Sequence, residues 1–410
     1  MSRQHHRQHQ RIWVGIDAGK AHHWAVGLDA DGNRLFSRRV VNDEQEIAGL
    51  IEMACSLAEQ VRWAVDISSR TSALLLALLA GRGQPLAYIP GRTVNRMSGA
   101  YSGEGKTDAK DARIIADTLR MRRDFRPAGA PAERASELEL LTSYRRDLVA
   151  DRVRMVNRLR ELLAGISPAL ERQFQFRRRP ALVLLCGYQT PSALRRIGVG
   201  RLTEWLARRG VRNPESTAAK AVQAAHAQRA VLPGEGRAAR IVADLARQIL
   251  DLDRRISDLD SEITEVFRAD ERAKVIESLP GMGPILGAEF LAAVTDLGAY
   301  QDADHLAAHA GLAPVPRDSG RKTGSRRRPR HYDRRLRRLF YLSAQTAMSR
   351  PGSSRDYYRK KRSEGHIHTQ AVLCLARRRV NVLWAVIRDQ RPYATTPPLP
   401  GTASASPVTG

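Results

Sequence analysis

The stretch RIWVGIDAGKAHHWAVGLDADGNRLFSRRVV, residues 11–41, decides the fold of the first part of the chain. It holds three short apolar runs, at 11–17, 23–29 and 34–41, and the turn ADGN separates the last two. Apolar, β-branched and aromatic residues between such turn signals are typical of strands, and a short Asp-Gly turn is typical of a hairpin. The stretch therefore predicts three antiparallel strands.

The residues that follow alternate between helical and extended patterns. A helix is predicted over about 44–59, a strand over 61–66, a second helix over 71–83 and a strand over 85–90. An antiparallel meander followed by alternating helix and strand predicts an α/β domain with a mixed sheet.

Four aspartates stand at the ends of these elements. Asp17 and Asp66 each end a predicted strand, and Asp108 and Asp111 follow Thr107 at the start of a predicted helix. Singly, each has a simpler explanation as a turn residue or as an acidic residue in a first helical turn, with Thr107 as the N-cap. A spacing of three puts two side chains on one helix face, and ligands of open α/β sheets gather at strand ends. Together the four carboxylates predict a Mg²⁺ site, because hard divalent cations prefer oxygen ligands.

Composition indicates the class of partner. The 410 residues include 68 Lys and Arg against 43 Asp and Glu, a net charge of +25, which favours DNA or RNA as partner. The length predicts two or three domains. The three cysteines have no zinc-binding or disulfide spacing, and we find neither a signal peptide nor an apolar run of the ~20 residues that cross a bilayer. We expect a soluble, cytoplasmic protein without a membrane partner.

The middle of the chain, 129–270, is predicted to be helical. Apolar residues recur at heptad-like spacing in 132–166 and, without a break, in 242–266, which favours a coiled coil. The alternative is an amphipathic helix packed within its own chain. The apolar positions are Leu141, Leu148, Met155, Leu159 and Leu162 in the first segment and Val242, Leu245, Ile249, Leu252, Ile256, Leu259, Ile263 and Val266 in the second. An insert at about 180–235, containing RRIGVGRLTEWLARRG, is interpreted as a further nucleic-acid contact.

The C-terminal domain is predicted at 271–390 and is mainly helical. LPGMG, residues 279–283, resembles the turn of a helix-hairpin-helix, in which Gly281 and Gly283 would let backbone N–H groups approach a phosphate. Basic residues then crowd together as a phosphate-gripping surface would require, the candidates being Arg317, Arg321, Lys322, Arg326, Arg327, Arg328 and Arg330. A solvated basic face is the alternative. The tails at 1–10 and 391–410 are predicted to be disordered.

Two parts of the chain resemble the DEDD-type transposases of the insertion sequence 110 family. Residues 12–123, through GIDAGK, AVDISS and GKTDAKDARIIAD, resemble its RuvC-like N-terminal domain, which has the RNase H fold. The resemblance assigns a domain at 11–128 and metal-binding roles to the four aspartates, although Asp66 stands where the family usually has glutamate. Residues 272–385 resemble the second domain, whose nucleophilic serine follows AGLxP. The motif here is RDSGRKTG, which makes Ser319 the matching residue. Ser325, in GSRRR, has similar basic neighbours and is the competing candidate.

The resemblance implies a recombinase that cuts and rejoins donor and target DNA. It also implies guidance by a structured bridge RNA and a homo-oligomer, a dimer assembling to a tetramer, in which the two half-sites meet between subunits. One alternative is a hydrolytic nuclease of the Holliday-junction-resolving kind, in which the carboxylates activate water and Ser319 is a turn residue. The other is a non-catalytic nucleic-acid-binding protein. A covalent protein–DNA adduct distinguishes the recombinase from the nuclease.

Overall fold

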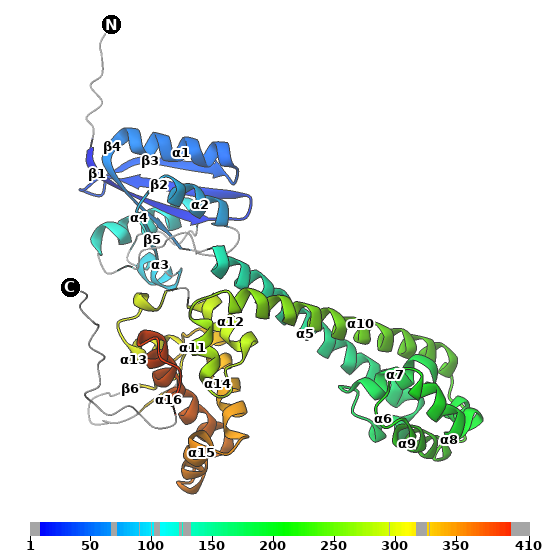
Figure 1. Cartoon of the computed structure of the whole chain (residues 1–410). Coiled ribbons are helices and arrows are strands. Elements are labelled where there is room, and N and C mark those ends of the chain that lie inside the picture. Colours follow the sequence, from blue (N-terminus) through cyan, green and yellow to red (C-terminus); the bar gives the residue numbers. More distant parts are fainter. Residues whose placement is uncertain are drawn as a thin grey trace, which may run out of the picture. The chain divides into compact units, whose positions relative to one another are not determined.

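The computed structural model describes residues 9–66, 72–89, 91–99, 101, 107–122, 125, 133–294, 296–316, 326–327 and 329–394. The chain divides into two compact units, Met1–Ala132 and Glu133–Gly410. The first unit holds the sheet and runs from blue to cyan in Figure 1, and the second is mainly helical.

The first unit is built on a mixed five-stranded sheet, as the sequence predicted. Its order is β3-β2-β1-β4-β5. The first three strands pair antiparallel, whereas β1 with β4 and β4 with β5 pair parallel. The strands are β1 His9–Ala18, β2 His22–Leu28, β3 Arg34–Val41, β4 Ala58–Val65 and β5 Leu86–Tyr88.

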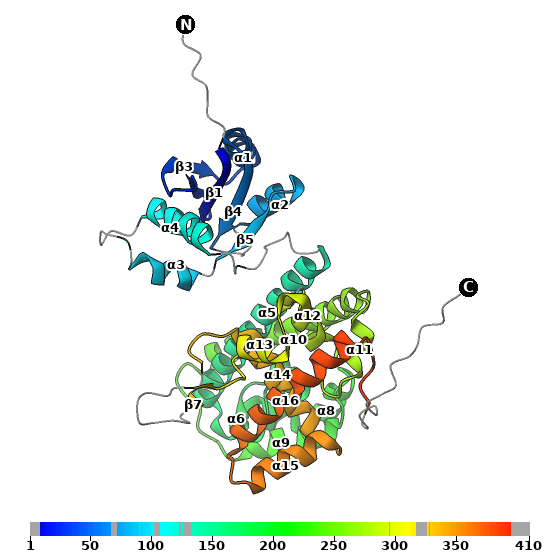
Figure 2. The ribbon, with the colours of Figure 1, turned by 90° about the vertical axis from the view of Figure 1, so that its left-hand side faces the viewer.

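Helices cover both faces of this sheet (Figure 2). The helices α1, Glu44–Leu57, and α2, Ala73–Gly81, pack on the face to which Ile12, Val14 and Ile16 of β1 contribute. The helix α4, Asp108–Met121, packs on the other face, where Ala112 and Ala116 meet apolar side chains of β2. Because side chains alternate along a strand, the odd-numbered residues of β1 face α4.

Some boundaries differ from the predictions. β1 begins at His9, which pairs with Ala58, so the strand takes in two residues assigned to the N-terminal tail. α1 ends at Leu57 and β4 begins at once, because the backbone from Ala58 onward pairs with β1. A short helix, α3 Gly91–Ser98, was not predicted.

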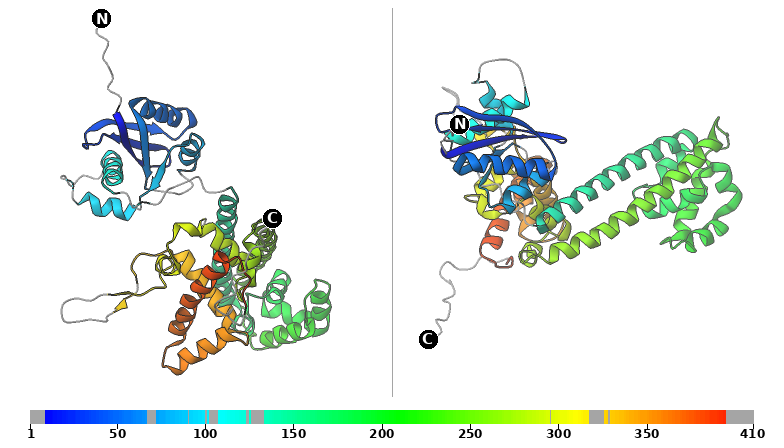
Figure 3. Two further views of the ribbon diagram at one scale, coloured as in Figure 1. Left: turned by 60° about the vertical axis from the view of Figure 1, so that its left-hand side comes forward. Right: turned by 90° about the horizontal axis from the view of Figure 1, so that it is seen from above.

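Two helices of equal length form the axis of the second unit. α5, Glu133–Ile166, and α10, Glu235–Arg268, lie side by side in Figure 1 and in the right-hand view of Figure 3. They run antiparallel, because Arg145 pairs with Asp260 and Arg152 with Asp253. Both segments with heptad-like spacing, 132–166 and 242–266, are thus helical, as predicted.

The heptad residues of this pair are covered by the chain itself. Ile249, at 0 % exposure, belongs to a core that joins the second half of α5 to the first half of α10, and Leu259 and Ile263 belong to a second core at the other end of the pair. The buried positions of the predicted set are Leu148, Leu159, Val242, Leu245, Ile249, Leu252, Leu259 and Ile263.

The predicted insert forms three helices, α7 Arg179–Gly187, α8 Pro191–Ala207 and α9 Pro214–His226. With the preceding helix α6, Pro168–Gln173, they surround the first of these cores. α8 is interrupted at Gly198, whose φ of 69° and ψ of 171° are not helical.

The remaining helices surround the second core, which contains Phe290 and Phe340. They are α11 Ala273–Ser278, α12 Pro284–Ala293, α13 Ala303–His309, α14 Arg334–Met348, α15 Ser353–Ser363 and α16 His368–Arg388. The chain stays attached beyond α16, because the backbone N–H of Tyr393 donates to Ser278 Oγ at 2.8 Å, so the predicted tail does not begin at 391. Within the described part of the chain, no helix is both long and apolar enough to span a membrane.

Candidate metal and nucleic-acid sites

Two of the four predicted carboxylates lie at the same end of the sheet. Ile16 of β1 is paired with Val65 of β4, and Asp17 and Asp66 are the next residues along these parallel neighbours. The backbone N–H of Ala18 lies 3.5 Å from Asp66 Oδ1, which places this carboxylate beside the end of β1. Both aspartates are half-buried. By the alternation of the strands, both carboxylates belong to the face that α4 covers.

The helix α4 points its first turn toward this end of the sheet. Near the C-terminal end of α4, Arg120 Nη1 donates to the carbonyl oxygen of Ala30 at 3.0 Å. Ala30 follows β2, and Leu28 at the end of β2 pairs with Trp13 near the start of β1, so this end of α4 lies near the start of β1. Its middle lies on Gly15, where a Cβ atom would be 2.2 Å from Ala116 N and 2.3 Å from Ala112 O. α4 thus runs antiparallel to β1, and Asp108 and Asp111 occupy the end nearer Asp17.

The start of α4 is a capped helix end. Thr107 Oγ1 accepts from Lys110 N at 3.2 Å, which confirms the predicted N-cap. Asp108 is exposed and Asp111 half-buried. Among the described residues, no three His, Cys, Asp or Glu side chains come close enough to hold a metal ion. The structure therefore brings the four aspartates to one end of the sheet without closing them into one ligand set, although their donor chemistry suits a hard divalent cation.

A carboxylate that the sequence analysis missed lies on the same helix. Asp117 pairs with Arg120 at 2.7 Å and accepts a hydrogen bond from the hydroxyl of Tyr101. Burial, and then this hydrogen bond, raise the pKa of Tyr101. Asp117 follows Asp111 by six residues, so helical spacing alone did not group it with the first turn.

In the sequence, residues 317–325, which include Ser319, stand between two short strands that pair antiparallel. β6, Val315–Pro316, pairs with β7, Arg326–Arg327, and Val315 is opposite Arg327. The predicted nucleophile Ser319 and its competitor Ser325 lie outside the described residues, as do Arg317, Arg321, Lys322 and Arg328. The backbones of Arg326 and Arg327 form β7, and Arg330 is exposed.

Some of the neighbouring arginines already have partners within the chain. Arg338 pairs with the buried Glu289 at 3.1 Å, and Arg335 pairs with Glu139 at 2.5 Å. These two side chains stabilise the packing of α14, so the basic character of this region is not wholly available to a phosphate backbone.

The predicted hairpin turn is packed against α14. Gly281 has a φ of 82°, and a Cβ atom there would lie 2.6 Å from Ser343 O and 2.9 Å from Ala347 N. Glycine is thus required by contact within the chain. Gly283 is exposed, with nothing within 4 Å of a Cβ built on it, so its side of the turn is open.

A buried arginine holds this turn from within. Arg379 of α16, 3 % exposed, donates to Ser343 Oγ from Nε at 3.0 Å and to Pro280 O from Nη2. Burial lowers the pKa of Arg379 to about 10. The sequence carried no signal for this role, because Arg379 is one of three consecutive arginines.

Comparison with known proteins decides the family. Residues 14–168 match a family model for DEDD-type transposases of the IS110 group, and residues 273–359 match one described as transposase IS116/IS110/IS902 family. The chain is 64 % identical over 397 residues to the insertion element IS116 uncharacterized 44.8 kDa protein of Streptomyces clavuligerus, covering 97 % of this chain and 99 % of that one. This chain belongs to the IS116/IS110/IS902 transposase family.

Two further relatives show the breadth of the family. The insertion element IS900 uncharacterized 42 kDa protein of Mycobacterium paratuberculosis is 53 % identical over 94 % of this chain and 98 % of its own length. The pilin gene-inverting protein of Moraxella bovis is 26 % identical over 30 % of this chain and 39 % of its own length. As a member of this transposase family, the chain is an enzyme that acts on DNA, and the family suggests a divalent metal.

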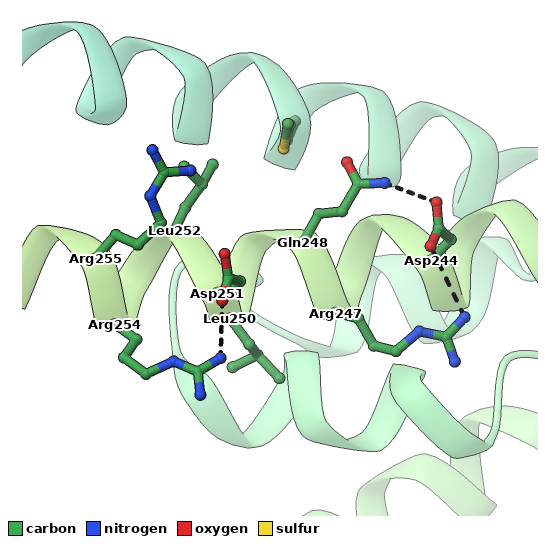
Figure 4. Close-up of a pocket in the computed structure, with 9 residues that line it drawn as sticks. Asp244, Arg247, Gln248, Leu250, Asp251, Leu252, Arg254 and Arg255 are labelled. Carbon is green, nitrogen blue, oxygen red and sulfur yellow. Dashed lines mark hydrogen bonds and ion pairs between the residues drawn. The ribbon is translucent and has the colours of Figure 1, made fainter.

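The transposase has a depression of about 720 Å³ on α10 of the second unit (Figure 4). Its two aspartates have partners on the same helix: Asp251 pairs with Arg254 at 2.8 Å, and Asp244 with Gln248 at 2.7 Å and with Arg247 at 3.9 Å. The third arginine, Arg255, donates to the neutral hydroxyl of Tyr144, so the depression keeps one excess positive charge.

Proposed function

We propose that this transposase is a serine recombinase of an insertion sequence, in which Ser319 attacks DNA and a Mg²⁺ site formed by Asp17, Asp66, Asp108 and Asp111 assists it. The observation that carries the metal half is the shared end of the sheet, where adjacent parallel strands end in carboxylates and α4 directs two more toward them. We assign this half to residues 11–128 and the serine half to residues 271–390.

The role proposed for Ser319 follows from the energetics of rejoining. Its Oγ loses a proton and attacks the phosphorus, a phosphoserine ester forms, and the leaving strand departs as a hydroxyl that takes up a proton. Attack by another strand's hydroxyl reverses these steps, so one ester is exchanged for another without ATP. Water would end the reaction as hydrolysis. Gly320 would allow close approach of a DNA backbone, and Arg317, Arg321 and Lys322 would neutralise its phosphate.

The four aspartates would bind the cation and fix its position beside the scissile phosphate. Mg²⁺ bound there would polarise the phosphodiester. Asp17 lies on β1, Asp66 directly follows its paired neighbour β4, and α4 packs on β1 at Gly15, so hydrogen bonding and packing position these side chains. Asp66 is one methylene shorter than the glutamate usual in the family.

Guidance by a bridge RNA and assembly into a dimer and tetramer complete the proposal. The net charge of +25 supports a polyanionic partner. The RNA and the meeting of half-sites between subunits follow from the family resemblance. The purified protein should carry one predominant RNA encoded beside its gene. A random mixture of cellular RNA would contradict guidance and leave the DNA chemistry standing.

The decisive test uses wild type, Ser319→Ala and Ser325→Ala with labelled DNA, co-purified RNA and Mg²⁺. We expect label to remain on denatured protein for wild type and Ser325→Ala and to be absent for Ser319→Ala. Cleavage that persists without Ser319 would favour the hydrolytic nuclease. An adduct lost only in Ser325→Ala would move the nucleophile to that residue.

The metal half is tested separately. Asp17→Asn and Asp108→Asn should each abolish Mg²⁺-dependent strand exchange with little change in thermal stability, and Asp66→Glu should retain activity. Asp31→Asn is the matched control, because Asp31 is exposed in the turn that follows β2. Wild-type activity in Asp17→Asn would exclude the site.

A further inference from the structure

The helical insert at the end of the α5–α10 pair is far more basic than the rest of the chain. Residues 177–229, which we call the arm tip, carry eleven Lys and Arg against two Asp and Glu, whereas the whole chain carries 68 against 43. All of the arm tip is described, and it lies between the two segments that match the family models. Ten of its eleven basic residues are exposed, and Arg195 is the partly buried one.

Few of these basic side chains form ion pairs. Within residues 177–229, the ion pair found is that of Arg208 with Glu204, at 3.7 Å and with side chains 77 % and 68 % exposed. Such an exposed pair contributes little and does not neutralise the surface. Burial raises the pKa of the Cys186 thiol, and the positive charges of Arg247, Arg209 and Arg179 oppose this rise. The arm tip therefore presents a net positive surface to solvent.

An open glycine turn lies within this surface. Gly198, at a φ of 69°, breaks α8 into two helical halves, followed by Val199 and Gly200. The order glycine, apolar residue, glycine recurs at 281–283, where Gly281 also has a positive φ. The environments differ. Met282 is 1 % exposed, whereas Val199 is 42 % exposed and nothing lies within 4 Å of a Cβ built on Gly198 or Gly200.

The turn is held rigidly and flanked by cations. Arg195 Nη1 donates to Ala225 O at 2.7 Å and to Gln228 O, which ties α8 to the end of α9. Arg196 precedes the turn and Arg201 follows it, and both are exposed. A surface that is already ordered loses little entropy when it binds a partner.

The aromatic residues of the arm tip favour a duplex over an unpaired strand. Single strands are bound by stacking their bases on accessible aromatic rings. Here Arg209 lies over the Trp205 ring at 3.8 Å, and Tyr188 meets that ring edge-on at 5.1 Å. Because Trp205 is occupied in this way and Tyr188 is only partly exposed, phosphates and not bases are the groups that this surface can recognise.

We propose that the arm tip is a second DNA-binding surface, which holds the phosphate backbone of duplex DNA apart from the segment that contains Ser319. Duplex DNA is the occupant because the chain acts on DNA and the surface has the charge for a backbone without the exposed rings for single strands. The contact would be independent of sequence and would anchor DNA that flanks the exchange site.

The test compares two double variants of the full-length protein. Arg196→Ala/Arg201→Ala removes the cations that flank the turn. Arg154→Ala/Arg254→Ala removes two equally exposed arginines of α5 and α10, 70 % and 71 % exposed, which are paired with Asp151 and Asp251. Affinity for a short labelled DNA duplex of arbitrary sequence is measured by fluorescence anisotropy over a series of salt concentrations, and thermal unfolding confirms that both variants fold.

We expect the arm-tip variant to bind the duplex more weakly than wild type does. The slope of its log affinity against log salt concentration should be shallower by about two, because each lost phosphate contact removes about one power of salt concentration. The control variant should match wild type. Equal salt slopes in all three proteins would overturn the proposal. A parallel measurement with the same duplex as RNA completes the test, since a loss confined to RNA would assign the surface to RNA and exclude the DNA role.

Discussion

Gly15 is the single residue on which the carboxylate end of the sheet most depends. The backbone of α4 lies so close to β1 at this point that no side chain fits between them. The absence of a Cβ thus sets the distance between the strand that carries Asp17 and the helix that carries Asp108 and Asp111.

Replacing Gly15 with valine should push α4 away from β1. We expect the free energy of unfolding to fall by about 1–3 kcal/mol, as for other overpacked cores, and strand exchange to be lost. Thermal unfolding and a recombination assay measure these effects. The control is Gly49→Ala in α1, where nothing lies within 4 Å of the added Cβ, and it should be neutral or stabilise by about 0.5–1 kcal/mol. Equal stability of the two variants would mean that α4 does not bear on Gly15.

His23 gives the first unit a dependence on pH. It is 2 % exposed, its Nε2 lies 3.1 Å from Asn42 Oδ1, and its Nδ1 has no hydrogen-bond partner among the described residues. Burial lowers the pKa of His23, the contact with Asn42 opposes this, and the neighbouring His22 lowers the pKa further. The unfolded chain, with the ordinary pKa of 6.5, therefore binds more protons below that pH than the folded chain does.

It follows that the first unit should lose stability as the pH falls below about 6.5, by at most about 1.4 kcal/mol per pH unit for this one group. The contribution is fully present above pH 6.5, where His23 is neutral in both states. Thermal unfolding of wild type and His23→Gln over a pH series measures the effect, and the variant should show a shallower slope. Identical slopes would show that His23 does not cause the dependence.

At the scale of elements, the α5–α10 pair links two cores. Ile249 lies in the core that the arm tip shares, and Ile241, on the same helix, is 49 % exposed. Ile249→Lys should lower the free energy of unfolding by several kcal/mol, because burying an unpaired charge is costly, whereas Ile241→Lys should be nearly neutral. Thermal unfolding and light scattering distinguish the explanations. A smaller particle with unchanged stability in Ile249→Lys would restore the interpretation of this residue as part of a seam between subunits.

At the scale of the whole molecule, the two units have separate cores. The clusters of the first unit are confined to residues before Ala132, and those of the second unit begin at Leu138. Calorimetry should therefore resolve two unfolding transitions. Gly15→Val should lower one of them and Ile249→Lys the other. A single transition that both substitutions shift would show that the units unfold together.

The sequence by itself determined the local pieces of this protein. The strands, the Thr107 cap, the long helices and the sheet-end positions of Asp17 and Asp66 follow from turn chemistry and from periods of two and about 3.6, which depend only on neighbouring residues. Family motifs further assigned a role to Ser319. The candidate carboxylates were thus identifiable before their arrangement was known.

Tertiary structure decided what covers each face and which residues meet. Heptad spacing marks an apolar stripe but cannot say whether the same chain or a second copy buries it, and here the same chain does. The glycine turns at 198–200 and 281–283 look alike in sequence, yet Met282 is buried and Val199 is exposed. The direction of α4 and the burial of Arg379 likewise rest on contacts between distant segments. Burial depends on what packs from elsewhere in the chain, and a local pattern does not carry that information.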